Sequence, residues 1–232
     1  MAETTGIEWT DATWNPWYGC RKVSPACAHC YAEREMTRYG RDFSVVTRAK
    51  DATFFAPLKW RNPRKVFTCS WSDFFIEQAD KWRTEAWNVI MQTPQHTYQV
   101  LTKRPERIGK STLEWPENIW LGVSVETPRQ YHRIDTLREI PAHIRFLSME
   151  PLLSDPRAVR LDGIHWVIAG TESGSGARPT DWDWIRRIRD NCKAAGVAFF
   201  VKQLTAEGIK IPFAIWPEDL RVREWPAEEG RK

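Results

Sequence analysis

The chain has 232 residues, 42% of them hydrophobic, which suits a compact α/β fold with a large core. Its net charge of +4 comes from 34 cationic and 30 anionic residues, so the sign of the charge is weak evidence for a nucleic-acid partner. No apolar run approaches the roughly 20 residues of a membrane span, and "MAETTGIEWTDATW" lacks the features of a signal peptide. We expect a cytoplasmic protein with no membrane contact.

The first predicted element is a cysteine-rich loop, "GCRKVSPACAHCYAE", at residues 19–33. Cys20, Cys27 and Cys30 form the pattern C-x(6)-C-x(2)-C. In a reducing compartment, clustered thiols are metal ligands or catalysts more often than disulfide partners. The next stretch, "YAEREMTRYG", predicts a helix that ends at Gly40. Cys30 then lies near a helix N-terminus, where the dipole favours the thiolate.

Residues 41–64 interleave cations with aromatic rings and predict an excursion from the regular pattern of the chain. One interpretation is a nucleic-acid surface, with cations for phosphates and rings for base stacking. The other is a packed loop whose rings are buried and whose charges are solvated. The cations are Arg41, Arg48, Lys50, Lys59, Arg61 and Arg64, and the rings are Phe43, Phe54, Phe55 and Trp60.

From residue 65 onward, short apolar runs alternate with helical patterns, which predicts a parallel sheet covered on both faces. We expect an α/β fold of parallel βα repeats, a partial or closed TIM-type barrel. It is predicted to form a single domain over 1–216, with a peripheral tail at 217–232. Strands are predicted at 65–70, 97–102, 118–125, 143–149, 164–170 and 197–203, and helices at about 79–92, 104–110, 128–139 and 181–195.

The last of these helices assigns one cysteine to the core. Asp181 or Asp183 can cap its start, and Gly196 can end it. One apolar stripe is predicted to contain Ile185, Ile188, Cys192 and Ala195. Cys192 is therefore not expected to bind a metal.

Polar side chains follow all six predicted strands. In parallel α/β folds the carboxyl ends of the strands gather the active site. We therefore expect a shared polar pocket, lined by Ser72, Asp73, Lys103, Glu126, Glu150 and Glu172.

Three interpretations of the cysteine loop compete. A structural zinc ion needs a fourth protein ligand, for which His29, His96 and Cys69 are available. A buried, inert set of cysteines conflicts with the polarity of "GCRKVSPACAHC". The third is a 4Fe–4S cluster held through three irons, which leaves the fourth iron open to a small molecule.

A three-cysteine loop ahead of βα repeats with polar strand ends resembles the radical S-adenosylmethionine enzymes. That resemblance implies that S-adenosylmethionine chelates the open iron through its amino and carboxylate groups. It implies cleavage to a 5′-deoxyadenosyl radical, with an external electron donor. Asp73 is then the expected acceptor for the amino group, Lys103 or Arg104 would contact the carboxylate, and Glu126 and Glu150 would contact the ribose.

A closer resemblance, to a phage-associated family of three-cysteine proteins, covers residues from about 5 to 204. It rests on "IEWTDATWNPWYGCRKVSPACAHCYAE", "SWSDFF", "HTYQVLTKRPERI", "WLGVSVET", "SMEPLL" and "GTESGSGARP…AFFVKQ". Likeness to the spore photoproduct lyases suggests Cys69 as a hydrogen-atom donor, while burial in its strand is the default. The chain departs from the usual C-x(3)-C-x(2)-C motif, because six residues follow Cys20 and His29 precedes Cys30.

The sequence thus leads to an iron–sulfur, radical S-adenosylmethionine enzyme, with DNA, RNA or a nucleotide as the preferred substrate. Repair or modification of nucleic acid would fit the basic, aromatic segment and the phage association. The alternative is a non-catalytic nucleic-acid-binding protein that is stabilised by zinc or by a cluster.

Overall fold

The computed structural model describes residues 4–110, 114–157 and 159–227. The chain divides into two compact units. The first comprises Met1–Val123 and Ile140–His143, and the second comprises Ser124–Glu139 and Ile144–Lys232.

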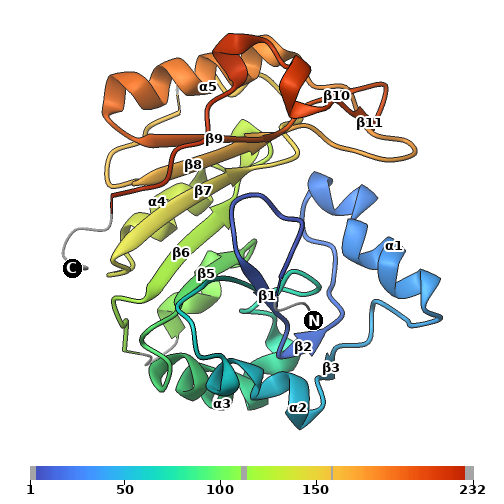
Figure 1. Ribbon diagram of the computed structural model, residues 1–232, viewed down its shortest axis with the longest axis vertical. Coiled ribbons are helices and arrows are strands. Elements are labelled where there is room, and N and C mark those ends of the chain that lie inside the picture. Colours follow the sequence, from blue (N-terminus) through green and yellow to red (C-terminus); the bar gives the residue numbers. More distant parts are fainter. Residues whose placement is uncertain (1–3, 111–113, 158, 228–232) are drawn as a thin grey trace. The chain divides into compact units, whose positions relative to one another are not determined.

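The first unit is built on parallel strands in the order β1 (Ala12–Trp14), β4 (Lys65–Thr68), β5 (Thr97–Thr102) and β6 (Ile119–Ser124) (Figure 1). Every residue of β6 is buried, as an unbroken apolar run predicts. A separate antiparallel pair joins β2 (Trp17–Tyr18) to β3 (Thr47–Arg48). The helices of the first unit, where η marks a 3-10 helix, are η1 (Pro25–His29), α1 (Tyr31–Arg38), α2 (Asp51–Phe54), η2 (Ala56–Lys59), η3 (Glu77–Ala79), α3 (Asp80–Met91) and η4 (Pro105–Lys110).

The second unit contains three parallel strands in the order β7 (Ile144–Met149), β8 (Trp166–Gly170) and β9 (Ala198–Gln203). Helix α5 (Trp182–Ala195) packs along β8 and β9 (Figure 1). A short hairpin follows, of β10 (Thr205–Ala206) and β11 (Ile209–Lys210). The remaining helices are η5 (Pro128–Gln130), α4 (His132–Arg138), η6 (Phe213–Ile215) and η7 (Glu218–Leu220).

Part of the C-terminal segment also pairs with β9. The backbone N–H of Val201 donates to the carbonyl of Val222, and that of Glu224 donates to Phe199, each at 2.9 Å. These bonds satisfy one edge of β9, which would otherwise present unpaired backbone groups.

Helix α5 confirms most of its predicted features. The Asp181 carboxylate accepts from the Asp183 backbone N–H, and Gly196 ends the helix in a left-handed conformation with φ 67°. Of the predicted stripe, Ala195 is exposed because it lies in the last turn of the helix. The rest of the stripe is fully buried: Ile185, Ile188 and Cys192.

The predicted fold class is confirmed as mixed α/β with parallel strands in each unit. All six predicted strands are present, and β5 has the predicted bounds. Two predicted helices differ, since the one at 104–110 is the 3-10 helix η4 and the one at 128–139 divides into η5 and α4. Among the described residues, no helix has the length and apolar character needed to cross a membrane.

Candidate functional site

The cysteine loop is anchored where it leaves β2. The backbone N–H of Gly19 donates to Trp71 at 3.1 Å, and that of Cys20 donates to Phe43 at 2.8 Å. Gly19 has a φ of 90°, and a Cβ there would lie 2.4 Å from the carbonyl oxygen of Val45. Only glycine fits this approach of two backbone segments, so Gly19 and these two bonds fix where the cysteine loop begins.

The three predicted ligands lie on one stretch of chain between β2 and α1. Each is half-buried and outside any disulfide. Cys20 and Cys30 pack against the same small apolar cluster, formed by Ala32, Met36 and Phe43. Cys27 lies close enough to Cys30 for its charge to raise the pKa of the Cys30 thiol.

Cys30 occupies the N-cap position of α1, as the sequence predicted. Backbone N–H groups of Glu33 and Ala32 donate toward its sulfur and favour the thiolate. Burial has the larger effect and raises the pKa of the Cys30 thiol above its usual value, although the Lys103 charge offsets part of it. Burial makes a thiolate at Cys30 costly, and the backbone N–H groups at the start of α1 reduce that cost.

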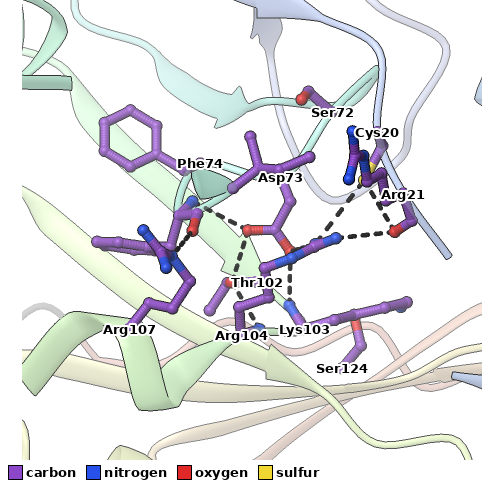
Figure 2. Close-up of polar contacts among 12 residues, drawn as sticks. Cys20, Arg21, Ser72, Asp73, Phe74, Thr102, Lys103, Arg104, Arg107 and Ser124 are labelled. Carbon is purple, nitrogen blue, oxygen red and sulfur yellow. Dashed lines mark hydrogen bonds and ion pairs between the residues drawn. The ribbon is translucent and has the colours of Figure 1, made fainter. Parts of the chain in front are cut away.

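Arg104 connects the cysteine loop to the ends of two strands (Figure 2). Its Nη1 donates to Asp73 Oδ2 at 2.9 Å and lies 3.8 Å from the Cys20 sulfur, within hydrogen-bonding range for sulfur. Its Nη2 donates to the carbonyl oxygen of Arg21 at 2.8 Å. Because Asp73 follows β4 and Arg104 follows β5, these bonds hold Cys20 at the carboxyl ends of both strands.

The Asp73 carboxylate is saturated with hydrogen bonds. Its Oδ1 accepts from the Phe75 backbone N–H at 2.9 Å and the Thr102 hydroxyl at 2.7 Å. Its Oδ2 accepts from the Lys103 backbone N–H and from Arg104, each at 2.9 Å. With its residue only 5% exposed, the carboxylate is placed to hold Arg104. Its predicted contact with the amino group of S-adenosylmethionine stays a prediction.

The pKa of the Cys20 thiol is raised to about 11, chiefly by burial and then by the charge of Asp73. Arg104 acts in the opposite direction through its charge and its hydrogen bond. The thiol is therefore protonated at neutral pH, and a metal ion that binds it must displace a proton.

Other strand-end residues also bind the cysteine loop. The Ser72 hydroxyl donates to the Gly19 carbonyl at 2.5 Å, and the Tyr31 hydroxyl donates to the Ser70 carbonyl at 2.6 Å. The side chain of Asn15 accepts from the Trp71 backbone N–H at 2.8 Å. Residues 70–73 after β4 thus form the surface on which the loop rests. The sequence had suggested Ser72 for the pocket but not its bond to the loop, which joins residues far apart in the chain.

Three predicted pocket residues belong to the second unit, and all three are in ion pairs. Glu126 is fully buried and pairs with Arg133 at 3.3 Å. Glu150 pairs with Lys202 at 2.6 Å, and Glu172 accepts two bonds from the Arg178 guanidinium, at 2.5 and 2.9 Å. These pairs place charge at the strand ends, and a role in binding S-adenosylmethionine stays a prediction for each glutamate.

Residues 4–213 match the family model described as "Protein of unknown function (DUF5131)". This chain belongs to the DUF5131 family. The match spans the three cysteines, Asp73 and Arg104, so the whole network around the cysteine loop lies within the DUF5131 region. Comparison with curated proteins and with solved structures gave no match.

The donor set of this DUF5131 protein fits an iron–sulfur cluster in its chemistry. Three soft thiol donors lie on one loop, and two of them share an apolar support. In the described part of the chain, no three His, Cys, Asp or Glu side chains are already gathered for metal binding. Of the possible fourth zinc ligands, His96 is fully buried and Cys69 is 3% exposed. The loop must therefore close further on any metal that it holds.

The excursion at 41–64 in the DUF5131 chain has the features of the packed-loop interpretation. Phe43, Phe54 and Trp60 are buried, so none of these rings offers a face to a base. Arg48 is engaged as well, since it pairs with Asp51 at 2.6 Å and its guanidinium lies 4.0 Å from the centre of the Phe54 ring. The exposed cations of the segment are Arg41, Lys50, Lys59 and Arg61.

Proposed function

We propose that this protein is an iron–sulfur enzyme of the radical S-adenosylmethionine type, in which Cys20, Cys27 and Cys30 hold a 4Fe–4S cluster. The supporting observation is that Arg104 bonds the cysteine loop to the carboxyl ends of β4 and β5. In parallel α/β folds this end of the strands carries the reactive site.

The residues around the loop suggest separate roles in this chemistry. When bound, a reduced 4Fe–4S cluster with one open iron supplies the electron that cleaves S-adenosylmethionine. Arg104 orients Cys20 and places a positive charge beside its sulfur. Lys103 places a second positive charge near Cys30, where it would attract the carboxylate of S-adenosylmethionine.

The proposal includes a more specific fold, which is a partial or closed TIM-type barrel. It also includes an external electron donor. Its substrate is a nucleic acid or a nucleotide, and the reaction is a repair or modification step. The supporting observation is that cations are exposed in and near the cysteine loop, among them Arg21 and Lys22.

Reductive cleavage of S-adenosylmethionine tests the proposal. The protein is purified without oxygen, reduced with dithionite and given S-adenosylmethionine, and 5′-deoxyadenosine and methionine are measured. We expect both products from the native chain and neither from the variant Cys27→Ser. Cleavage that is absent from an iron-loaded native protein, with and without DNA, RNA and nucleotides, would favour the non-catalytic alternative.

A further inference from the structure

A group of exposed and half-buried aromatic and basic side chains lies at the C-terminal end of α1. It comprises Tyr18, Arg38, Tyr39, Arg41 and Trp71, and we call it the α1-end surface. Tyr39 is 65% exposed, among the highest values for a large apolar side chain in the described residues. Neither the cysteine chemistry nor the packing of the core requires Tyr39 to be there.

The backbone fixes the geometry of this surface. Gly40 has a φ of 68°, and the N–H groups of Gly40 and Arg41 donate to the carbonyls of Thr37 and Met36, each at 2.9 Å. This is the Schellman pattern of hydrogen bonds that closes a helix. Tyr39 and Arg41 are therefore held on either side of a defined turn rather than on a mobile loop.

The rings of the surface are arranged as a stack with an edge contact. Tyr39 stacks on Trp71 with 6.4 Å between ring centroids and 30° between planes. Tyr18 meets the edge of Trp71 at 6.1 Å, and the Arg41 guanidinium lies 5.8 Å from the centre of the Tyr18 ring. Tyr18 and Trp71 are half-buried and hold the stack in place, while Tyr39 is exposed at its end, so the stack can extend by one more flat ring at little entropic cost.

The α1-end surface is continuous with the support of the cysteine loop. Tyr18 and Trp71 pack against the same apolar cluster as Cys20 and Cys30. A molecule stacked on Tyr39 would therefore lie next to the loop that carries the proposed cluster.

Cations around Tyr39 favour an anionic partner. The Arg38 side chain is 77% exposed and lies 4.0 Å from Glu35, a surface pair of little strength. Arg41 is exposed and makes no ion pair among the described residues. Side chains of this kind, with rings beside cations, bind single strands by stacking on bases and attracting phosphates.

We propose that the α1-end surface binds single-stranded nucleic acid, with a base stacked on Tyr39 and phosphates next to Arg38 and Arg41. In so far as the bound nucleic acid is the substrate, this inference rests on the proposed function. It differs from a general basic patch because it assigns binding to one ring and two nearby cations. A protein partner would instead be expected to need a broader apolar contact than one exposed tyrosine and its neighbours provide.

Binding is measured by fluorescence anisotropy with a labelled 12-nucleotide single strand, on the full chain as purified, over a range of salt concentrations. We expect Tyr39→Ala to weaken binding about tenfold and Tyr39→Phe to leave it nearly unchanged, because a ring is what the base requires. We expect the double variant Arg38→Gln/Arg41→Gln to weaken binding and to reduce its salt dependence.

A charge-matched control is Lys59→Gln/Arg61→Gln, which removes two exposed cations from the segment at 41–64. Equal weakening by both double variants, native affinity in Tyr39→Ala, or absence of binding by the native chain would each overturn the inference. Thermal melting shows that each variant is folded, and iron analysis of the same samples separates the two proposals. If the protein contains zinc and Tyr39→Ala weakens binding, only the proposed enzyme is refuted. If it contains iron and Tyr39→Ala binds as the native chain does, only the binding surface is refuted.

Discussion

Arg104 lies 84 positions from Cys20 in the chain, yet its guanidinium is 3.8 Å from the Cys20 sulfur. The same guanidinium is paired with Asp73, and both of these charged side chains are less than 10% exposed. A buried pair of this kind is costly to form, so its position beside a candidate metal ligand suggests a purpose beyond stability. We infer that Arg104 is a positioning residue for the cysteine loop.

Replacing Arg104 by methionine should destabilise the protein by about 3–5 kcal/mol, because it leaves the Asp73 carboxylate buried without its partner. The double variant Asp73→Asn/Arg104→Met should recover part of this loss. Urea denaturation of the three proteins measures the effect. Arg38→Met is the matched control, since the Arg38 side chain is 77% exposed and should cost little. Equal costs at Arg38 and Arg104 would refute the role assigned to the buried pair.

Serine at Cys20, Cys27 or Cys30 should remove most of the bound iron, since each variant leaves only two of the three thiolates. Iron is measured per chain after anaerobic reconstitution. Cys192→Ala serves as the control because Cys192 is fully buried on α5 and should not affect iron content. A variant at Cys27 that retained native iron content would remove Cys27 from the ligand set.

Metal binding should protect the cysteine loop from trypsin. Arg21 and Lys22 are exposed cleavage sites within the loop, which must close further to hold a metal. We expect cleavage there to slow after reconstitution and to recover when a chelator removes the metal. The bond after Arg61 is an exposed internal reference whose cleavage should stay constant. Mass spectrometry of the early fragments distinguishes the two sites, and equal protection at both would indicate a general change in stability.

Cys69 is buried and has an unusual backbone conformation. Its φ is 65°, a left-handed conformation that costs a non-glycine residue about 1–3 kcal/mol. We therefore expect Cys69→Gly to be at least as stable as Cys69→Ala, measured by urea denaturation. The reverse order is expected at Cys192 on α5, where glycine costs about 1 kcal/mol relative to alanine. If alanine is the better residue at both positions, the left-handed backbone at Cys69 is not under strain.

Much of the fold could be predicted because its signals are local. The buried strand β6 is a nearly unbroken apolar run, and Gly40 and Gly196 end their helices with positive φ as expected. Strand β1 was missed because its three residues, Ala12–Trp14, are too short to show a period. Burial of the rings at 41–64 depends on tertiary packing, so the sequence left two interpretations open there.

The candidate site was predictable only in part, for the same physical reason. The cysteine spacing and the strand-end polar residues are visible in the sequence, and they indicated Asp73 and Lys103. The bonds from Arg104 to Cys20 and from Ser72 to Gly19 join distant segments, and no local pattern reports them. The stack of Tyr39 on Trp71 was missed because its two rings come from separate elements.

The identity of the bound metal tests the central claim most directly. Protein purified without oxygen is examined by metal analysis and by absorption spectroscopy. We predict a brown protein with about four irons per chain and broad absorption near roughly 400 nm, where thiolate-to-iron charge transfer occurs. A colourless protein with one zinc ion per chain and no iron would contradict the proposed cluster.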